Sequence, residues 1–82
     1  MDYYETIEKK VKDFCEKQYS DASKEKTVKE ILNIRAIAFG ALMFACNNLF
    51  PRFNGGLSDW WNDEMWGKFE NLITEIYKKE RQ

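Results

Sequence analysis

The amino-acid sequence predicts an all-α fold, an antiparallel three-helix bundle with a long central second helix, in a single domain covering residues 1–82. Three observations lead to this prediction. Apolar residues recur at spacings of three and four in three separate segments, which is the period of an amphipathic helix. Helix-breaking residues gather between the second and third segments, where Pro51 precedes the pair Gly55–Gly56. The chain of 82 residues is 44% apolar, which is enough for one core.

The first helix is expected over residues 3–19. Asp2 can cap its first turn while Glu5 reaches back to the chain, in a capping-box arrangement. Residues 20–23 are mostly small and polar, so they are interpreted as a connection. The predicted apolar stripe consists of Tyr4, Ile7, Val11 and Phe14.

The second helix is expected over residues 28–49, behind a second capping box made by Thr27 and Glu30. Its beginning is polar on one side, but its later part is apolar nearly all round, so neighbouring helices are expected to cover both sides. The predicted main face holds Val28, Ile31, Leu32, Phe39, Leu42, Met43, Cys46 and Leu49. The opposite side carries Lys29, Glu30 and Asn33, then Ala36, Ile37, Gly40, Phe44 and Asn47.

The third helix is expected over residues 59–80. Pro51 prevents the second helix from continuing, and the Gly55–Gly56 pair supplies the backbone freedom for a reversal. Ser58 is the predicted N-cap, and Asp59 suits the positive end of the helix dipole. The predicted apolar stripe consists of Trp61, Met65, Phe69, Leu72 and Ile76.

Arg35 falls within the apolar face of the second helix. A buried guanidinium without a partner is very costly, so Arg35 is expected to pair with a carboxylate, cap carbonyls or reach the edge of the core. Glu64 is the predicted partner. The pair either fixes the register of the helices or anchors a ligand.

The third helix carries more aromatic residues than its core stripe needs. Trp60 projects to the predicted outer face, together with Asp63, Gly67 and Asn71. Trp66 and Tyr77 lie on the flank of the core stripe. Exposed aromatic residues beside a glycine are typical of a protein interface, so these six residues are predicted to bind a partner. Alternatively, residues 52–57 fold over Trp60, and the first helix covers the flank that carries Trp66 and Tyr77.

No catalytic or metal-binding constellation is found, so the chain is predicted to be no enzyme and to need no cofactor or metal. Asp59, Asp63 and Glu64 form a carboxylate cluster, but a helix N-terminus attracts acids without any catalytic role, and the chain has no histidine. Cys15 and Cys46 are expected to be buried thiols in a reducing compartment. The beginning of the chain does not have the pattern of a secretory signal, and no apolar run is long enough for a membrane span, so a cytoplasmic location is expected.

Two stretches resemble small helical proteins encoded by phages and integrated elements of Gram-positive gut bacteria. They are RAIAFGALMFACNN (residues 35–48) and LSDWWNDEMWGKFENL (residues 57–72). The resemblance covers the second half of the chain and carries no defined site. It implies an accessory protein of the anti-CRISPR type, which blocks a bacterial defence effector by binding it.

The leading hypothesis is therefore a non-enzymatic protein-interaction module, whose partner is either a second copy of the chain or a bacterial defence effector. The resemblance implies that it acts as a mobile-element inhibitor. The alternative is a helical regulator associated with nucleic acid. The lysines that would serve it are Lys9, Lys10, Lys12, Lys17, Lys24, Lys26 and Lys29. Interleaved acids at Glu8, Asp13, Glu16 and Glu25 argue against phosphate binding, because they cancel the positive field that it needs.

Overall fold

The protein is all-α, as the computed structural model shows for the residues it describes, 3–24, 27–49 and 55–81. No strand occurs within these ranges. Two short π-helical segments, η1 and η2, interrupt or extend the α-helices. The elements in chain order are α1 (Tyr3–Ala22), α2 (Val28–Phe44), η1 (Ala45–Leu49), α3 (Gly55–Trp60), η2 (Trp61–Met65) and α4 (Trp66–Glu80).

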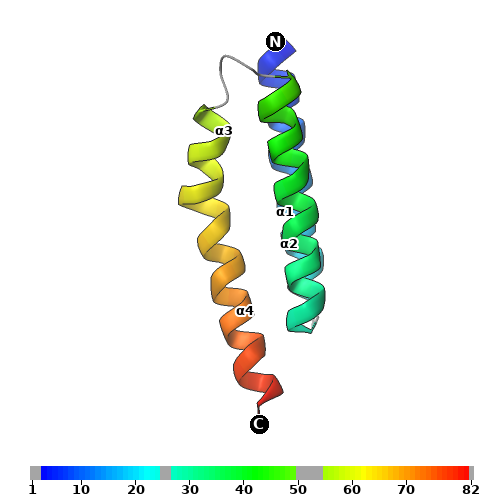
Figure 1. Ribbon diagram of the computed structural model, residues 1–82, viewed down its shortest axis with the longest axis vertical. Helices are drawn as coiled ribbons and strands as arrows, with labels where there is room; N and C mark the ends of the chain where they lie inside the picture. The colour runs from blue at the N-terminus through cyan, green and yellow to red at the C-terminus, as the bar shows by residue number, and fades with distance from the viewer. Residues whose placement is uncertain (1–2, 25–26, 50–54, 82) are drawn as a thin grey trace.

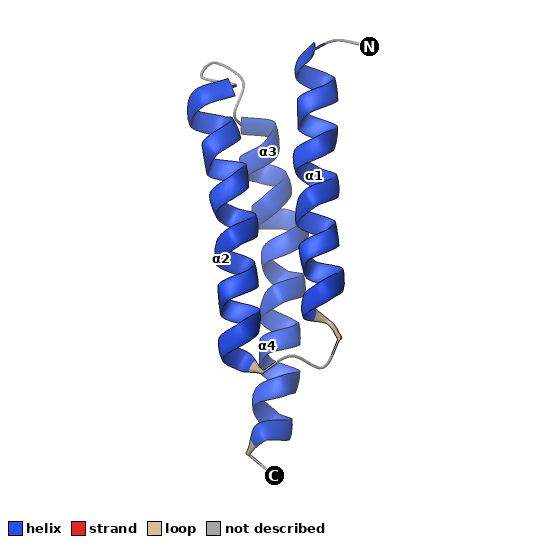
Figure 2. Ribbon diagram, turned by 90° about the vertical axis from the view of Figure 1, so that its right-hand side faces the viewer, coloured by secondary structure: helices blue, strands red, loops and turns tan. Residues whose placement is uncertain are grey.

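The helices lie side by side along an elongated molecule of 48 × 17 × 17 Å, with α1 behind α2 in the view of Figure 1. α1 and α2 run in opposite directions and form one pair, and α3, η2 and α4 follow one another in the third column (Figure 2). α2 packs against both α1 and α4. No helix in the described part of the chain is long and apolar enough to cross a bilayer.

The N-cap predicted at Thr27 is confirmed, and Glu30 of the predicted capping box bonds the Thr27 side chain. The Glu30 backbone N–H donates to the Thr27 hydroxyl over 3.2 Å, and that hydroxyl donates in turn to the Glu30 carboxylate over 3.2 Å. The cap predicted at Asp2 lies outside the described residues. α1 itself continues to Ala22, past the predicted end at residue 19, because Ala22 is fully buried and its helical turn is held by the core.

Small side chains form the contact between α1 and α2. Cys15 and Ala38 are fully buried, and the Cys15 thiol donates to the Ala38 carbonyl oxygen over 3.5 Å. The prediction that Phe14 and Tyr4 belong to the core stripe is wrong, since they are 37% and 41% exposed. Two helices that approach this closely need small residues at the contact, so Cys15 takes the place that the larger Phe14 was expected to fill.

The predicted core stripe of the third column is confirmed: Trp61, Met65, Phe69 and Leu72 are buried, and Ile76 is partly buried against them. The column, however, begins at Gly55, not at residue 59. Ser58 lies inside α3 and is therefore not its N-cap, and the Gly55–Gly56 pair belongs to the helix rather than to a turn.

The π-helical segment η2 explains how the core stripe extends to the start of α3. The Trp66 backbone N–H bonds to the Trp61 carbonyl, five residues back, so this turn holds one more residue than an α-helical turn. All residues before it are thereby rotated by nearly one residue step, about 100°. This rotation brings Leu57 onto the buried side, where it is 2% exposed.

Candidate functional site

Arg35 pairs with Glu70 of α4, and the predicted pairing with Glu64 is wrong. The guanidinium Nη1 donates to the Glu70 carboxylate over 2.6 Å. Because α2 and α4 run in opposite directions, the level of Arg35 along α2 corresponds to that of Glu70. Glu64 lies six residues earlier, about 9 Å away along the helix axis, and is exposed.

The indole of Trp66 completes this arrangement. The Arg35 guanidinium carbon lies 4.3 Å from the centre of the Trp66 ring, which is within cation–π distance. The arginine side chain is only 19% exposed, while Trp66 is 44% exposed. Arg35, Trp66 and Glu70, called the junction cluster below, thus form a polar and aromatic surface between α2 and α4. The alternative in which α1 covers the flank of Trp66 and Tyr77 is wrong, because these residues are 44% and 50% exposed.

The largest departure from the prediction concerns the side of α2 that faces away from α1 and α4. Neighbouring helices were expected to cover it, yet Ile37 is 55% exposed and Phe44 is 60% exposed. Leu32 and Phe39 are 41% and 42% exposed along its edge. We call this surface the outer face of α2; it consists of the exposed residues Asn33, Ala36, Ile37, Gly40 and Phe44.

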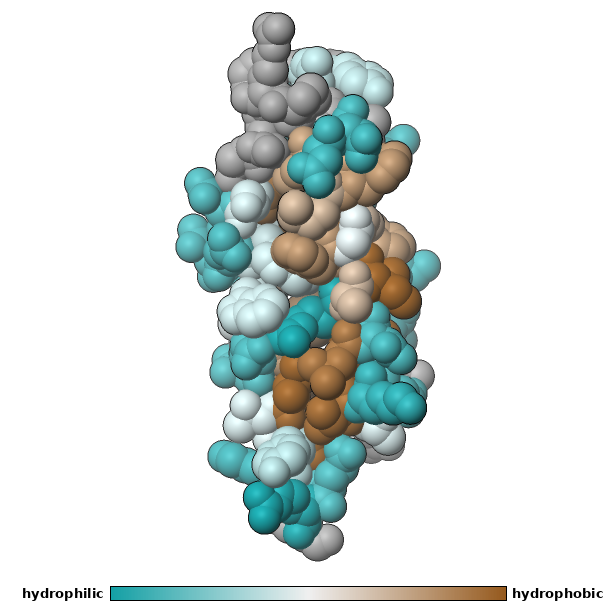
Figure 3. Space-filling view, viewed as in Figure 1, coloured by the Kyte–Doolittle hydropathy of each residue, from teal (hydrophilic) through white to brown (hydrophobic). Residues whose placement is uncertain are grey.

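Apolar side chains form a strip over α2 and its junction with α4, with polar side chains on both sides (Figure 3). Phe39 connects the strip to the core, because its ring centre lies 5.3 Å from that of Trp61. A contiguous apolar surface of this kind in a small protein is typical of an interaction site. The sequence contained a signal for this exposed surface. α2 is apolar on both sides, and a helix in a three-helix protein keeps one side toward solvent.

Trp60 does not lie on the outer face, so that expectation is wrong. It is partly buried against the core, and the Lys12 ammonium lies 5.6 Å from its ring centre. The rotation introduced by η2 is the reason, since it turns this residue toward α1. Asp63, Gly67 and Asn71 are exposed as expected.

Tyr77, the last of the predicted partner-binding residues, is 50% exposed near the end of α4. The Arg81 guanidinium donates to its hydroxyl over 3.1 Å and lies 5.5 Å from its ring centre. The predicted set is therefore spread over two sides of the third column and does not form one patch. Of its members, only Trp66 belongs to the junction cluster.

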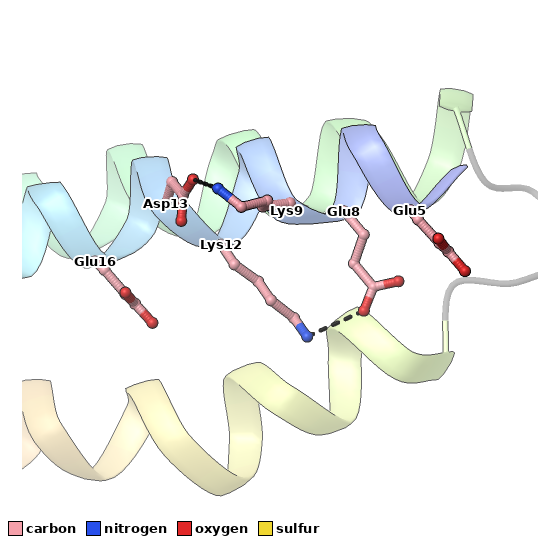
Figure 4. A pocket seen from close by; sticks show the side chains of 6 residues that line it. All are labelled: Glu5, Glu8, Lys9, Lys12, Asp13 and Glu16. Carbon is pink, nitrogen blue, oxygen red and sulfur yellow. Dashed lines mark hydrogen bonds and ion pairs between the residues drawn. The ribbon is translucent and has the colours of Figure 1, made fainter. Parts of the chain in front are cut away.

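A hollow of about 360 Å³ lies beside α1, where charged side chains point toward α3 (Figure 4). Its lining residues are Glu5, Glu8, Lys9, Lys12, Asp13 and Glu16. Both lysines are paired within the helix, Lys9 with Asp13 and Lys12 with Glu8, each at 3.0 Å. The lining of the hollow therefore has more acidic than basic residues, and both of its lysines are already paired with acids, so it is not suited to bind an anion.

The other groups considered for chemistry are dispersed or buried. Asp59, Asp63 and Glu64 are exposed, and the described ranges contain no group of three or more residues suited to hold a metal ion. Cys15 and Cys46 are buried and are not joined in a disulfide. Burial, and then the neighbouring Glu16 charge, raises the pKa of Cys15 to about 11, so its thiol is protonated and poorly nucleophilic at neutral pH.

Comparison with known proteins gives no match to a family model, a curated protein or a solved structure. The residues that carry a function are therefore inferred from surface geometry and chemistry.

Proposed function

We propose that this chain, as an antiparallel three-helix bundle, is a non-enzymatic protein-interaction module that binds its partner through the outer face of α2. The exposure of Ile37 and Phe44 is the observation that carries the proposal. Full burial of a large apolar side chain contributes about 1.5 to 3 kcal/mol, and these two side chains forgo roughly half of that because they are 55% and 60% exposed. A partner that covers the face recovers this free energy.

The junction cluster supports the same function beside the apolar strip. Trp and Arg are the residue types most enriched among interface hot spots. Here Arg35 holds the Trp66 ring from one side by stacking, so the ring is oriented before a partner arrives. A preoriented aromatic side chain loses little conformational entropy on binding.

The resemblance to mobile-element proteins adds the kind of action to this proposal. An inhibitor of the anti-CRISPR type works by covering a surface of a bacterial defence effector, and it needs an interaction face but no catalytic residues. A single apolar helix face flanked by Trp66 meets that need. The nucleic-acid alternative is less well supported, because Lys9, Lys12 and Lys24 are paired with acids of the same helix or turn.

Photo-crosslinking in the native host tests the proposal. A benzoylphenylalanine replaces Phe44 in one variant and Phe14 in the control variant; both are exposed phenylalanines, but Phe14 lies on α1. We expect a covalent adduct with a specific protein, whether foreign or a second copy, from position 44 and none from position 14. Adducts from neither position, or equally from both, would contradict the proposal.

A further inference from the structure

Arg35 is the one charged residue of the sequence between Ile31 and Leu49, and most of its hydrogen-bonding capacity is unused. A guanidinium carries five N–H donors in a flat fork that fits both oxygens of a carboxylate. Here a single bond, from Nη1 over 2.6 Å, reaches the Glu70 carboxylate. No other acceptor in the described ranges bonds the Arg35 side chain. The other donors of the fork are therefore available to a second acceptor.

These unused donors are open to the surface between α2 and α4. The Arg35 side chain is only 19% exposed, yet the described residues contain no buried side-chain nitrogen or oxygen without a hydrogen-bond partner. The unbonded nitrogens of Arg35 therefore reach solvent. The guanidinium also lies over the Trp66 ring, which fixes the plane of the fork. A mostly desolvated and oriented guanidinium attracts an anion more strongly than a mobile lysine on the surface does.

Apolar side chains lie on both sides of Arg35 along α2. Leu32 comes three residues before it and Phe39 four residues after it, and these spacings return to one side of an α-helix. The two side chains are 41% and 42% exposed. An anion that reaches Arg35 should therefore be flanked by apolar groups. A carboxylate in an apolar stretch of a protein has such surroundings, whereas a nucleic-acid phosphate lies in a row of like charges.

We infer that the junction cluster binds the side-chain carboxylate of an aspartate or glutamate of the partner. The unused donors of Arg35 hold this carboxylate, and apolar side chains on each side of the acid cover Leu32 and Phe39. The inference rests on the proposed function, because it names the chemistry of the partner beside the outer face of α2. Glu70 is 48% exposed and competes with the incoming acid for the guanidinium. A partner with a lysine at this place would be rejected.

A peptide probe tests the inference on the purified full chain. The probe is a helical peptide, blocked at both ends, with one glutamate that has a leucine three residues before it and another four residues after it. Its control carries glutamine in place of the glutamate. An NMR titration follows the Arg35 Nε–H and the Trp66 indole N–H. We expect saturable shifts of both signals and a Kd about tenfold lower for the glutamate peptide, because a charged acceptor bonds a guanidinium more strongly.

Two pairs of variants locate the bound carboxylate. Arg35→Met should abolish the preference for glutamate, while Lys29→Met, which removes an exposed charge from the same helix, should keep it. Glu70→Gln should tighten binding of the glutamate peptide by about two- to fivefold, because it removes the competing carboxylate. Glu75→Gln changes the charge equally on another side of α4 and should leave the affinity unchanged.

Several results would overturn the inference. They are equal affinity for the two peptides, a preference that survives Arg35→Met, and an affinity that the two glutamine variants of α4 raise alike. N-acetyl-leucine, whose carboxylate is a chain end, would overturn it too if it shifts both signals while the peptide does not. Absence of peptide binding together with a specific crosslink from position 44 would overturn the inference and leave the proposed function standing. Absence of both would contradict both.

Discussion

Among the single residues, Arg35 carries two interactions at once, an ion pair with Glu70 and a stacking contact with Trp66. Their contributions differ in kind. Glu70 is 48% exposed, so water screens the ion pair, and such pairs contribute about 0 to 1 kcal/mol. The arginine side chain is mostly buried and its guanidinium lies over the indole, which makes its packing the larger contribution.

This difference yields a prediction for three variants. Arg35→Ala should destabilise the protein by about 1–2 kcal/mol, because it removes the stem and the stacking contact. Arg35→Met should recover part of that loss by keeping the stem volume, and Glu70→Gln should cost less than about 1 kcal/mol. Urea unfolding measures all three. If the three variants unfold together with the wild type, Arg35 has no structural role.

Trp60 and Trp66 should respond to truncation in the order opposite to that expected from the sequence, which placed Trp60 on the outer face and Trp66 on the flank of the core stripe. Trp60 packs against the core, so Trp60→Ala should destabilise by about 1–3 kcal/mol. Trp66 is 44% exposed, so Trp66→Ala should cost less than about 1 kcal/mol but weaken partner binding. Thermal unfolding compares the two directly. A larger loss for Trp66 than for Trp60 would contradict the described positions.

Cys15 makes the stability depend on alkaline pH. Its folded pKa of about 11 lies above the ordinary value of 9.0, so the folded state keeps the proton where the unfolded chain releases it. This contribution is complete below pH 9 and is lost as the pH rises toward 11, by about 2–3 kcal/mol. The stability difference between wild type and Cys15→Ala in urea should therefore shrink from pH 8 to pH 10.5. A difference that stays constant over this range would be inconsistent with a buried neutral thiol.

The third column, made of α3, η2 and α4, shows which part of a sequence pattern predicts a helix and which part does not. The stripe of the third column was predictable because Trp61, Met65 and Phe69 are large and evenly spaced. The rotation at η2 could not be predicted, because a π-helical turn has no residue signature that distinguishes it from an α-helical turn. Because this turn rotates Trp60 toward the core, the prediction that Trp60 lies on the outer face was wrong.

The helix α2 has two sides that should respond differently to truncation. Leu42 is 1% exposed, so Leu42→Ala should destabilise by about 2–5 kcal/mol through lost burial and a cavity. Phe44 lies two residues further along the same helix and is 60% exposed, so Phe44→Ala should change monomer stability by less than about 0.5 kcal/mol. Urea midpoints at low protein concentration measure both. Comparable losses would mean that the chain itself buries the outer face.

For the molecule as a whole, the sequence pattern predicted how many helices form and which residues of the third column are buried. It did not reveal which sides stay open, because periodicity reports that a helix is apolar all round but not how many neighbours surround it. The prediction for α2 assumed that every apolar side is covered within one chain. Ile37 and Phe44 are 55% and 60% exposed, so the described part of the chain leaves this side of α2 uncovered.

Hydroxyl-radical footprinting tests most directly the claim that the outer face of α2 is a binding surface left open by the folded chain. In dilute purified protein, Phe44 and Ile37 should be oxidised readily, while the buried Phe69 should be protected. In the host cell, or at high protein concentration if the partner is a second copy, both outer residues should become protected and Tyr3 on α1, which is 63% exposed, should not. Protection of Phe44 already in the dilute monomer, or none under any condition, would contradict the claim.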